Sequence, residues 1–130
     1  MKTVLVADDR ETGRELVRTA IESSGYRVVE ATDGVEAVRL ARECSPDLVI
    51  LDLQMPRLDG FGVLAELRAD PKLCRTPVLA LTASAMPADR GKAEKAGFDA
   101  YFSKPVRLSA LREEVARFLR DNGAPSDAKG

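Results

Sequence analysis

Histidine and tryptophan are absent from the 130-residue sequence, and cysteine occurs only twice. The lack of histidine removes the side chain that most often serves as a general base or metal ligand, and it excludes a phosphohistidine on this chain. Cys44 and Cys74 are far apart and form no Cys-x-x-Cys pair, so we expect two reduced thiols. Any histidine chemistry must therefore come from another protein.

The sequence also lacks an excess of charge of one sign and any long hydrophobic run. Lys+Arg 20 and Asp+Glu 21 nearly cancel, so no overall positive field favours direct DNA binding. No apolar run approaches the roughly 20 residues that a membrane-spanning helix needs, and no basic apolar leader follows Met1. We therefore expect a cytoplasmic protein with no membrane segment and no direct contact with DNA.

The remaining composition is that of one ordinary globular domain, with 45% hydrophobic and 32% charged residues. A chain of this length can bury roughly two-thirds of its unfolded surface around a single core. Residues 122–130 contain glycine, proline and serine and predict a flexible C-terminal tail. The domain is therefore expected to span residues 1–121.

Five short apolar segments alternate with five segments of helical periodicity. The strands are expected at residues 3–7, 27–31, 48–52, 78–81 and 99–103, and the helices at about 11–24, 33–44, 58–69, 87–96 and 107–120. Such alternation favours a parallel sheet covered on both faces through right-handed crossovers. The predicted fold is α/β, a flavodoxin-like, doubly wound five-stranded parallel sheet in the order 2-1-3-4-5 with five helices.

The apolar positions of the helices predict which of their faces are buried. Leu16 belongs to the apolar stripe of the first helix, and Val35 and Val38 belong to that of the second. We expect all three in the core. The fourth helix, residues 87–96, offers mostly alanines for burial and contains Gly91, which costs up to about 1 kcal/mol relative to alanine. It should therefore be the least firmly held helix.

Polar groups follow four of the five predicted strands. Asp8 and Asp9 follow the first strand, Asp52 ends the third, Thr82 follows the fourth and Lys104 follows the fifth. In a parallel sheet all these exits lie along one edge, and the first and third strands are neighbours where the crevice opens. We interpret these residues as one functional site rather than as unrelated turn residues.

The residue types at this edge favour phosphoryl transfer. Three carboxylates in one crevice repel each other by about 3 kcal/mol per pair at about 5 Å and an effective dielectric constant of about 20, so a cation is expected among them. Oxygen ligands without histidine or thiolate favour Mg²⁺. Lys104 can neutralise an incoming phosphoryl group, and Thr82 can donate a hydrogen bond to it. The product would be an acyl phosphate on Asp52.

The strand-end residues and those that follow them form a specific combination: Asp8-Asp9, Asp52 with Met55-Pro56 and Asp59-Gly60, Thr82-Ala83 and Lys104-Pro105. Together they resemble the receiver domain of two-component response regulators, of the single-domain, chemotaxis-regulator-like kind. The resemblance covers residues 2 to about 120. It implies a phosphoacceptor signalling protein rather than an enzyme, one that contributes to its own phosphorylation and dephosphorylation.

The resemblance also implies roles for individual residues. Asp52 would accept the phosphoryl group from a phosphohistidine of a sensor histidine kinase or a histidine phosphotransfer protein. Mg²⁺ would be held by Asp9, Asp52 and the backbone carbonyl of Gln54, with Asp8 acting mainly through a metal-bound water. Lys104 would pair with the phosphate.

Further implied features concern the switch and the output. Thr82 and Tyr101 match the switch positions of the family, and the peptide bond before Pro105 would be cis. Gln54 and Ser84 would flank the phosphate and tune its lifetime. The fourth helix, fifth strand and last helix would form the surface that binds a downstream protein target, in a monomer or a weak dimer.

Two alternatives stay open at this point. A phosphatase of the haloacid dehalogenase type also forms an aspartyl phosphate with Mg²⁺, but it needs a second carboxyl two residues after the nucleophile, where this sequence has Gln54. An amide cannot supply that proton. The other alternative is a phosphorylation-independent protein-binding module on the same fold.

Overall fold

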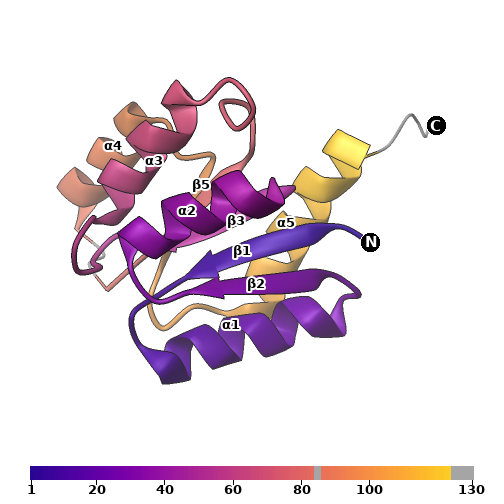
Figure 1. The fold of residues 1–130 in the computed structure, drawn as a ribbon. Coiled ribbons are helices and arrows are strands. Elements are labelled where there is room, and N and C mark those ends of the chain that lie inside the picture. The colour runs from indigo at the N-terminus through magenta and orange to yellow at the C-terminus, as the bar shows by residue number, and fades with distance from the viewer. Residues whose placement is uncertain (84–85, 124–130) are drawn as a thin grey trace.

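Five β-strands alternate with five α-helices in the computed structural model, which describes residues 1–83 and 86–123 (Figure 1). The strands are β1 (Thr3–Ala7), β2 (Arg27–Ala31), β3 (Leu48–Asp52), β4 (Val78–Thr82) and β5 (Ala100–Ser103). The helices are α1 (Glu11–Ser23), α2 (Gly34–Cys44), α3 (Gly60–Ala69), α4 (Pro87–Ala96) and α5 (Leu108–Gly123). Every predicted element is present, and no predicted end differs from these bounds by more than three residues.

The largest of these differences is at the C-terminus. Helix α5 continues to Gly123, so the predicted domain boundary at residue 121 falls within its last turn. Ser84 and residues 124–130 lie outside the described residues. The role of Ser84 and the flexible tail therefore stay predictions.

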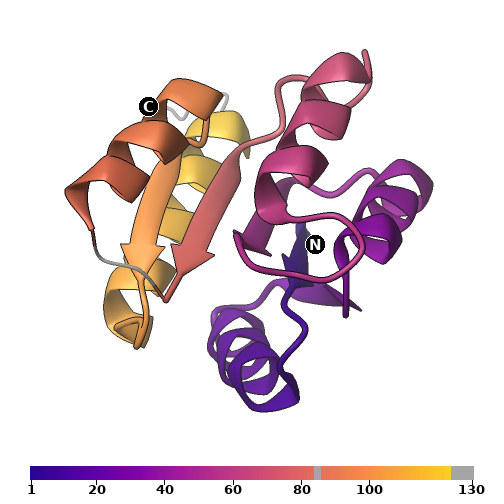
Figure 2. The ribbon, with the colours of Figure 1, turned by 90° about the vertical axis from the view of Figure 1, so that its left-hand side faces the viewer.

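The strands form one parallel sheet in the order β2-β1-β3-β4-β5, as predicted. Figure 2 shows the neighbouring arrows of β4 and β5 pointing the same way. All residues of β3 and β4, two of the three inner strands, are buried, which accounts for the apolar runs in their sequences. The chain order reverses between β1 and β3, so the crevice of the sheet opens between their carboxyl ends.

Helices cover both faces of this sheet (Figure 1). On one face, Leu5 and Val49 belong to a buried cluster that includes Leu64 of α3, together with residues of α2 and α4. On the other face, Val4 packs in a second cluster with Leu111 of α5 and with residues of α1. Because alternate residues of each strand point to opposite faces, one apolar strand serves both clusters.

Aspartate side chains cap two of the helices. Asp33 accepts a hydrogen bond from the backbone N–H of Glu36 at 2.8 Å, and Asp59 accepts one from Gly62 at 2.9 Å. Helix α3 therefore begins at Gly60, two residues later than predicted. A β-carbon at position 60 would lie 2.8 Å from the carbonyl oxygen of Asp52, so only glycine lets the helix start this close to the end of β3.

The burial prediction was wrong for two helix residues. Leu16 is 55% exposed and Val35 is 44% exposed, although both belong to apolar stripes. Successive helix residues are rotated by about 100°, so a residue at the margin of a stripe can face solvent while its neighbour is buried. In α1 the buried neighbour is Val17, and in α2 it is Val38, as predicted.

Helix α4 has the fewest buried residues of the fully described helices, with Ala93 as its one buried residue. The other candidate alanines, Ala88 and Ala96, are exposed. The sequence correctly indicates a helix with little apolar anchoring. Over the described residues, no helix combines the length and apolar character that crossing a membrane requires.

Candidate functional site

The strand exits meet at one edge of the sheet, as the predicted topology requires. Asp52 is the last residue of β3 and pairs with Leu81 of β4, one residue before Thr82. The backbone N–H of Lys104, just after β5, donates to the carbonyl oxygen of Thr82 at 2.7 Å. Asp8 follows β1, the other neighbour of β3. The sheet therefore fixes the positions of these side chains through its hydrogen bonds.

Three carboxylates converge at the crevice. One oxygen each from Asp8, Asp9 and Asp52 can be chosen so that all three lie within 4.8 Å of one another. Asp8 and Asp52 are buried, at 1% and 4% exposure, whereas Asp9 is exposed. Oxygen-only ligands around an opening to solvent suit Mg²⁺, which binds a few carboxylates and keeps several waters. The donor set thus fits the predicted metal.

Backbone groups orient the two buried carboxylates. The Oδ1 atom of Asp8 accepts a hydrogen bond from the N–H of Arg10, and Oδ1 of Asp52 accepts one from the N–H of Gln54, both at 2.9 Å. Each is a bond to the residue two positions further along the chain, a common arrangement for aspartate at a turn. The second oxygen of each carboxylate is left for other partners.

The ammonium group of Lys104 contacts the second oxygen of both buried carboxylates. Its Nζ lies 3.0 Å from Oδ2 of Asp8 and 2.8 Å from Oδ2 of Asp52. From the sequence, Lys104 is expected to neutralise an incoming phosphoryl group. In the structure its charge also offsets the repulsion between two of the three acids. Lys104 is 23% exposed, so it can be reached from solvent.

The electrostatic environment shifts two pKa values at this site. Burial raises the pKa of Asp52 above the usual value for an aspartate, against the opposing effect of hydrogen bonds from Lys104 and the Gln54 backbone. Burial by itself would lower the pKa of Lys104, but its hydrogen bonds to Asp52 and Asp8 outweigh burial and the pKa is raised. The lysine is therefore held in its charged form.

The other predicted residues lie around this centre. Thr82 is 2% exposed at the end of β4, next to the strand that carries Asp52. The side chain of Gln54 is exposed beyond β3. The peptide bond between Lys104 and Pro105 is cis. All of them border the same edge of the sheet.

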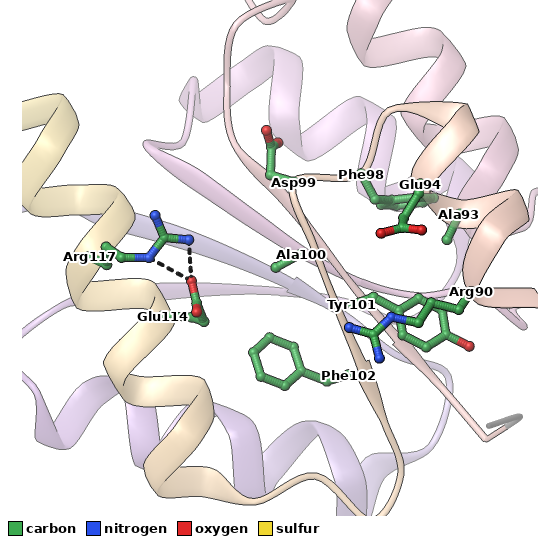
Figure 3. Close-up of a pocket in the computed structure, with 10 residues that line it drawn as sticks. All are labelled: Arg90, Ala93, Glu94, Phe98, Asp99, Ala100, Tyr101, Phe102, Glu114 and Arg117. Atoms are coloured by element: carbon green, nitrogen blue, oxygen red, sulfur yellow. Dashed lines mark hydrogen bonds and ion pairs between the residues drawn. The ribbon is translucent and has the colours of Figure 1, made fainter. Parts of the chain in front are cut away.

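Tyr101 does not join the acidic cluster. It lies on β5, half-buried, and lines a pocket of about 320 Å³ bordered by α4, β5 and α5 (Figure 3). The guanidinium of Arg90 on α4 lies 5.8 Å from the centroid of the Tyr101 ring, within range of a cation–π contact. On the α5 side, Arg117 and Glu114 form an ion pair at 2.6 Å.

Arg14 is not among the site residues predicted from the sequence. Its guanidinium donates to the backbone carbonyl of Asp8 at 2.9 Å and to the carboxylate of Glu30 at 2.9 Å. The one signal in the sequence is Glu30 itself, a charged residue between the apolar residues Val29 and Ala31 of a predicted strand. Its partners lie 12 and 16 positions earlier in the chain, and helical periodicity does not reveal such a contact.

Known proteins are similar to this chain in sequence and in fold. The profile described as response regulator receiver domain matches residues 4–116. The polar-differentiation response regulator DivK of Brucella anthropi is 38% identical over 120 residues, which cover 92% of this chain and 98% of DivK.

Two solved structures are similar over almost their whole length. Chemotaxis protein CheY4 of Vibrio cholerae is 30% identical with a TM-score of 0.85, over 92% of this chain and 99% of that chain. The receiver domain of a sensor histidine kinase of Pseudomonas aeruginosa is 32% identical with a TM-score of 0.84, over 91% of this chain and 97% of that chain. The latter structure has a magnesium ion coordinated in its active-site cleft.

The family match, the sequence identity and the acidic pocket point to the same assignment. A pocket of three carboxylates at the carboxyl ends of β1 and β3 is consistent with Mg²⁺-dependent phosphorylation of an aspartate. The chain belongs to the response regulator receiver domain family, the phosphoacceptor proteins of two-component signalling.

Proposed function

We propose that Asp52 is the phosphoacceptor and that it takes its phosphoryl group from a phosphohistidine of a sensor histidine kinase or a histidine phosphotransfer protein. The observation that carries this proposal is the arrangement of the Asp52 carboxylate. One oxygen is fixed by the Gln54 N–H, and the other lies 2.8 Å from the Lys104 ammonium. Asp52 is also the one of the three acids that ends an inner strand.

In the proposed reaction an oxygen of Asp52 attacks phosphorus, and the bond between phosphorus and the partner's imidazole nitrogen breaks. The electron pair of that bond leaves with the imidazole, and the product is an acyl phosphate on Asp52. Lys104 lies close enough to offset the charge of the phosphoryl oxygens, because its Nζ already contacts the attacking carboxylate. Thr82 would donate a hydrogen bond to the same group.

Asp8, Asp9 and Asp52 would hold Mg²⁺, with the backbone carbonyl of Gln54 as a further ligand and Asp8 acting mainly through a bound water. The ion would supply positive charge opposite the phosphoryl oxygens. The oxygen-only donor set supports this assignment, as does the magnesium ion in the similar Pseudomonas receiver domain.

Phosphorylation would switch the surface around Tyr101. A phosphate on Asp52 would draw Thr82 inward and leave space for Tyr101, and α4, which buries one residue, could shift at low cost. The pocket of Figure 3 would then change shape and bind a downstream protein target. We expect a cytoplasmic protein that acts as a monomer or as a weak dimer through this face, and the free thiols Cys44 and Cys74 fit a reducing compartment.

Amide NMR spectra recorded with Mg²⁺, before and after addition of beryllofluoride, test this function. We expect changes near Asp52 that extend through Thr82 to Tyr101 and α4. The matched control is Asp52→Asn, which keeps the shape of the side chain and should abolish the response to beryllofluoride. A wild-type response to Mg²⁺ but not to beryllofluoride would contradict the proposal and favour a phosphorylation-independent binding module.

A further inference from the structure

Arg14, on the first turns of α1, is joined to the peptide that carries the acidic pair. Its Nη1 atom donates to the carbonyl oxygen of Asp8 at 2.9 Å, and this carbonyl belongs to the peptide unit between Asp8 and Asp9. The side chain of Arg14 is 13% exposed, so most of its length is packed. A planar guanidinium with several donors can hold two acceptors at once in a fixed geometry.

The second acceptor of Arg14 is Glu30, and this contact links Asp8 to β2. The Nε atom of Arg14 contacts Oε1 of Glu30 on β2 at 2.9 Å. The next residue of β2, Ala31, accepts a hydrogen bond from the backbone N–H of Asp8 at 3.1 Å. The N–H of Asp8 is therefore hydrogen-bonded directly to β2, and the C=O of Asp8 is linked to β2 through Arg14.

We propose that Arg14 is a positioning residue for the metal site, which sets the Mg²⁺ affinity by fixing the peptide between Asp8 and Asp9. This inference rests on the proposed function, because it assumes that these carboxylates bind Mg²⁺. Arg14 acts through the backbone and contacts neither the metal nor the phosphoryl group. Glu30 serves to hold Arg14 in place.

The physical reason is preorganisation. Asp8 is already oriented by the Arg10 N–H and by Lys104, whereas Asp9 is exposed just beyond the end of β1. Rotation of the peptide between them would move the Asp9 carboxylate away from Asp8 and Asp52. Metal ligands that must be ordered on binding lose affinity, and residues that hold the ligands in place are worth about 10–100-fold in metal affinity.

Arg18 provides a matched control on the same helix. It lies one turn after Arg14, and its Nη1 contacts the other oxygen of the Glu30 carboxylate at 3.1 Å. Both arginines therefore form an ion pair with Glu30, and both contribute to the packing of α1 on β2. The two differ in that Arg14 also donates a hydrogen bond to the Asp8 carbonyl. A purely structural role predicts similar Mg²⁺ affinities for the two folded variants, whereas a positioning role predicts a weaker affinity in the Arg14 variant.

The experiment compares Mg²⁺ titrations of wild type, Arg14→Met and Arg18→Met, followed by the amide NMR signals of Asp8, Asp9 and Asp52. We expect the Mg²⁺ dissociation constant to rise about tenfold in Arg14→Met and less than about twofold in Arg18→Met. The midpoint of thermal unfolding without metal should fall further in Arg14→Met, because Arg14 is the more buried side chain and also holds the Asp8 carbonyl. The Mg²⁺ dissociation constant of the folded protein is therefore the quantity that tests the positioning role. Arg14→Lys, which keeps the charge but cannot hold both acceptors in the same geometry, should also weaken Mg²⁺ binding and serves as the test if Arg14→Met does not fold.

The outcomes separate this inference from the proposed function. Equal losses of Mg²⁺ affinity in Arg14→Met and Arg18→Met, or an unchanged affinity in Arg14→Met or Arg14→Lys, would overturn the positioning role while leaving the phosphoacceptor role intact. A wild-type protein that does not bind Mg²⁺ would overturn both. A selective loss in the Arg14 variants supports the inference.

Discussion

Asp8 and Asp52 are buried and share one ammonium group, and this arrangement makes Lys104 part of the stability of the protein as well as of its chemistry. A buried carboxylate without a partner is costly, because the charge has lost its hydration. A metal ion at the same carboxylates would supply the positive charge that Lys104 otherwise provides. Lysine and metal should therefore partly substitute for each other in stabilising the fold.

The substitution Lys104→Met tests this relation. Without metal we expect a loss of about 3 kcal/mol in the free energy of unfolding, because two buried carboxylates lose their shared partner. Added Mg²⁺ should restore part of the loss, and it should stabilise the variant more than wild type. Urea unfolding with and without Mg²⁺ measures both effects. Lys72→Met, at an exposed site, is the control. The prediction would be contradicted if Mg²⁺ raised the free energy of unfolding by the same amount in wild type and in Lys104→Met.

The raised pKa of Asp52 predicts a pH dependence of its phosphorylation. Attack on phosphorus requires the carboxylate, so the rate should fall as the pH drops through the pKa of Asp52, at a higher pH than for an ordinary aspartate. A small acyl-phosphate donor, supplied at several pH values with saturating and with limiting Mg²⁺, gives the two profiles. The midpoint at limiting Mg²⁺ should be the higher of the two, because a bound cation favours the ionised form of the carboxyl group. A midpoint unaffected by metal would count against this account.

The same shift has a consequence for stability, with a defined sign. Because the pKa of Asp52 is raised in the folded protein, the folded state binds its proton more tightly than the unfolded state. This contribution is present at low pH and is lost as the pH rises through the folded pKa. Asp52→Asn, neutral at every pH, should therefore be at least as stable as wild type near neutrality. Unfolding curves from about pH 4 to pH 7 should show that the stability difference between Asp52→Asn and wild type becomes smaller, or changes sign, as the pH falls.

At the scale of single residues, the sequence predicted the types of group at the site better than their contacts. Asp8, Asp52, Thr82 and Lys104 were found because each follows an apolar strand, and strand ends are a short-range signal. The bond from Arg14 to the Asp8 carbonyl was not found, because it depends on the angle at which α1 packs on β2. Polar residues on a helix carry no period that distinguishes a packed arginine from a solvated one.

Among the helices, α4 combines a small buried surface with a glycine in its interior. Gly91 has an ordinary backbone angle, and a β-carbon there would meet no heavy atom within 4 Å. Nothing in the described structure therefore requires glycine at this position. Glycine at this position would keep the helix easy to displace, which the proposed switch requires.

Gly91→Ala is expected to stabilise the protein by about 0.5–1 kcal/mol and to slow amide hydrogen exchange in α4. The control is Gly97→Ala at the end of the same helix, where φ is +109° and a β-carbon is strained, with an expected loss of about 1–2 kcal/mol. Urea unfolding and exchange rates of the amides from Arg90 to Ala93 measure the two effects. Faster exchange in Gly91→Ala than in wild type would show that this glycine has another role.

The errors at this scale have a common physical origin. Hydrophobic periodicity located every helix, yet it placed Leu16 and Val35 in the core, and both are exposed. A stripe indicates the direction of the buried face only approximately, and the packing of neighbouring elements decides its margins. The start of α3 was missed by two residues because it depends on the close approach of Gly60 to β3, which is a contact between elements.

For the whole molecule, one edge of the sheet gathers the reactive groups, while the pocket around Tyr101 lies between α4, β5 and α5. Two of the acids lie just after β1 and the third is the last residue of β3, so a metal bound to all three joins separate parts of the chain. An ion that binds the folded state and not the unfolded chain stabilises the fold by mass action. Mg²⁺ should therefore raise the global stability, although it contacts one edge of the molecule.

The expected size follows from this linkage. When free Mg²⁺ is a hundred times its dissociation constant, the free energy of unfolding should rise by about 2.7 kcal/mol. For a domain of this length, that corresponds to a rise of about 10 °C in the unfolding midpoint. Thermal unfolding at increasing Mg²⁺, with potassium chloride of equal ionic strength as the reference, measures it. If the rise came from ionic strength alone, Mg²⁺ and potassium chloride would raise the midpoint equally, because screening depends on ionic strength.

The variant Asp9→Asn makes this whole-molecule prediction specific to the acidic site. Asp9 is exposed, so its substitution should change the stability without metal by less than about 0.5 kcal/mol. The Mg²⁺-dependent rise should nevertheless be largely lost, because one of the three proposed carboxylate ligands has become a neutral amide. An unchanged rise in Asp9→Asn would place the bound ion elsewhere on the protein. A lost rise with unchanged basal stability would tie the global stabilisation to the carboxylates at the ends of β1 and β3.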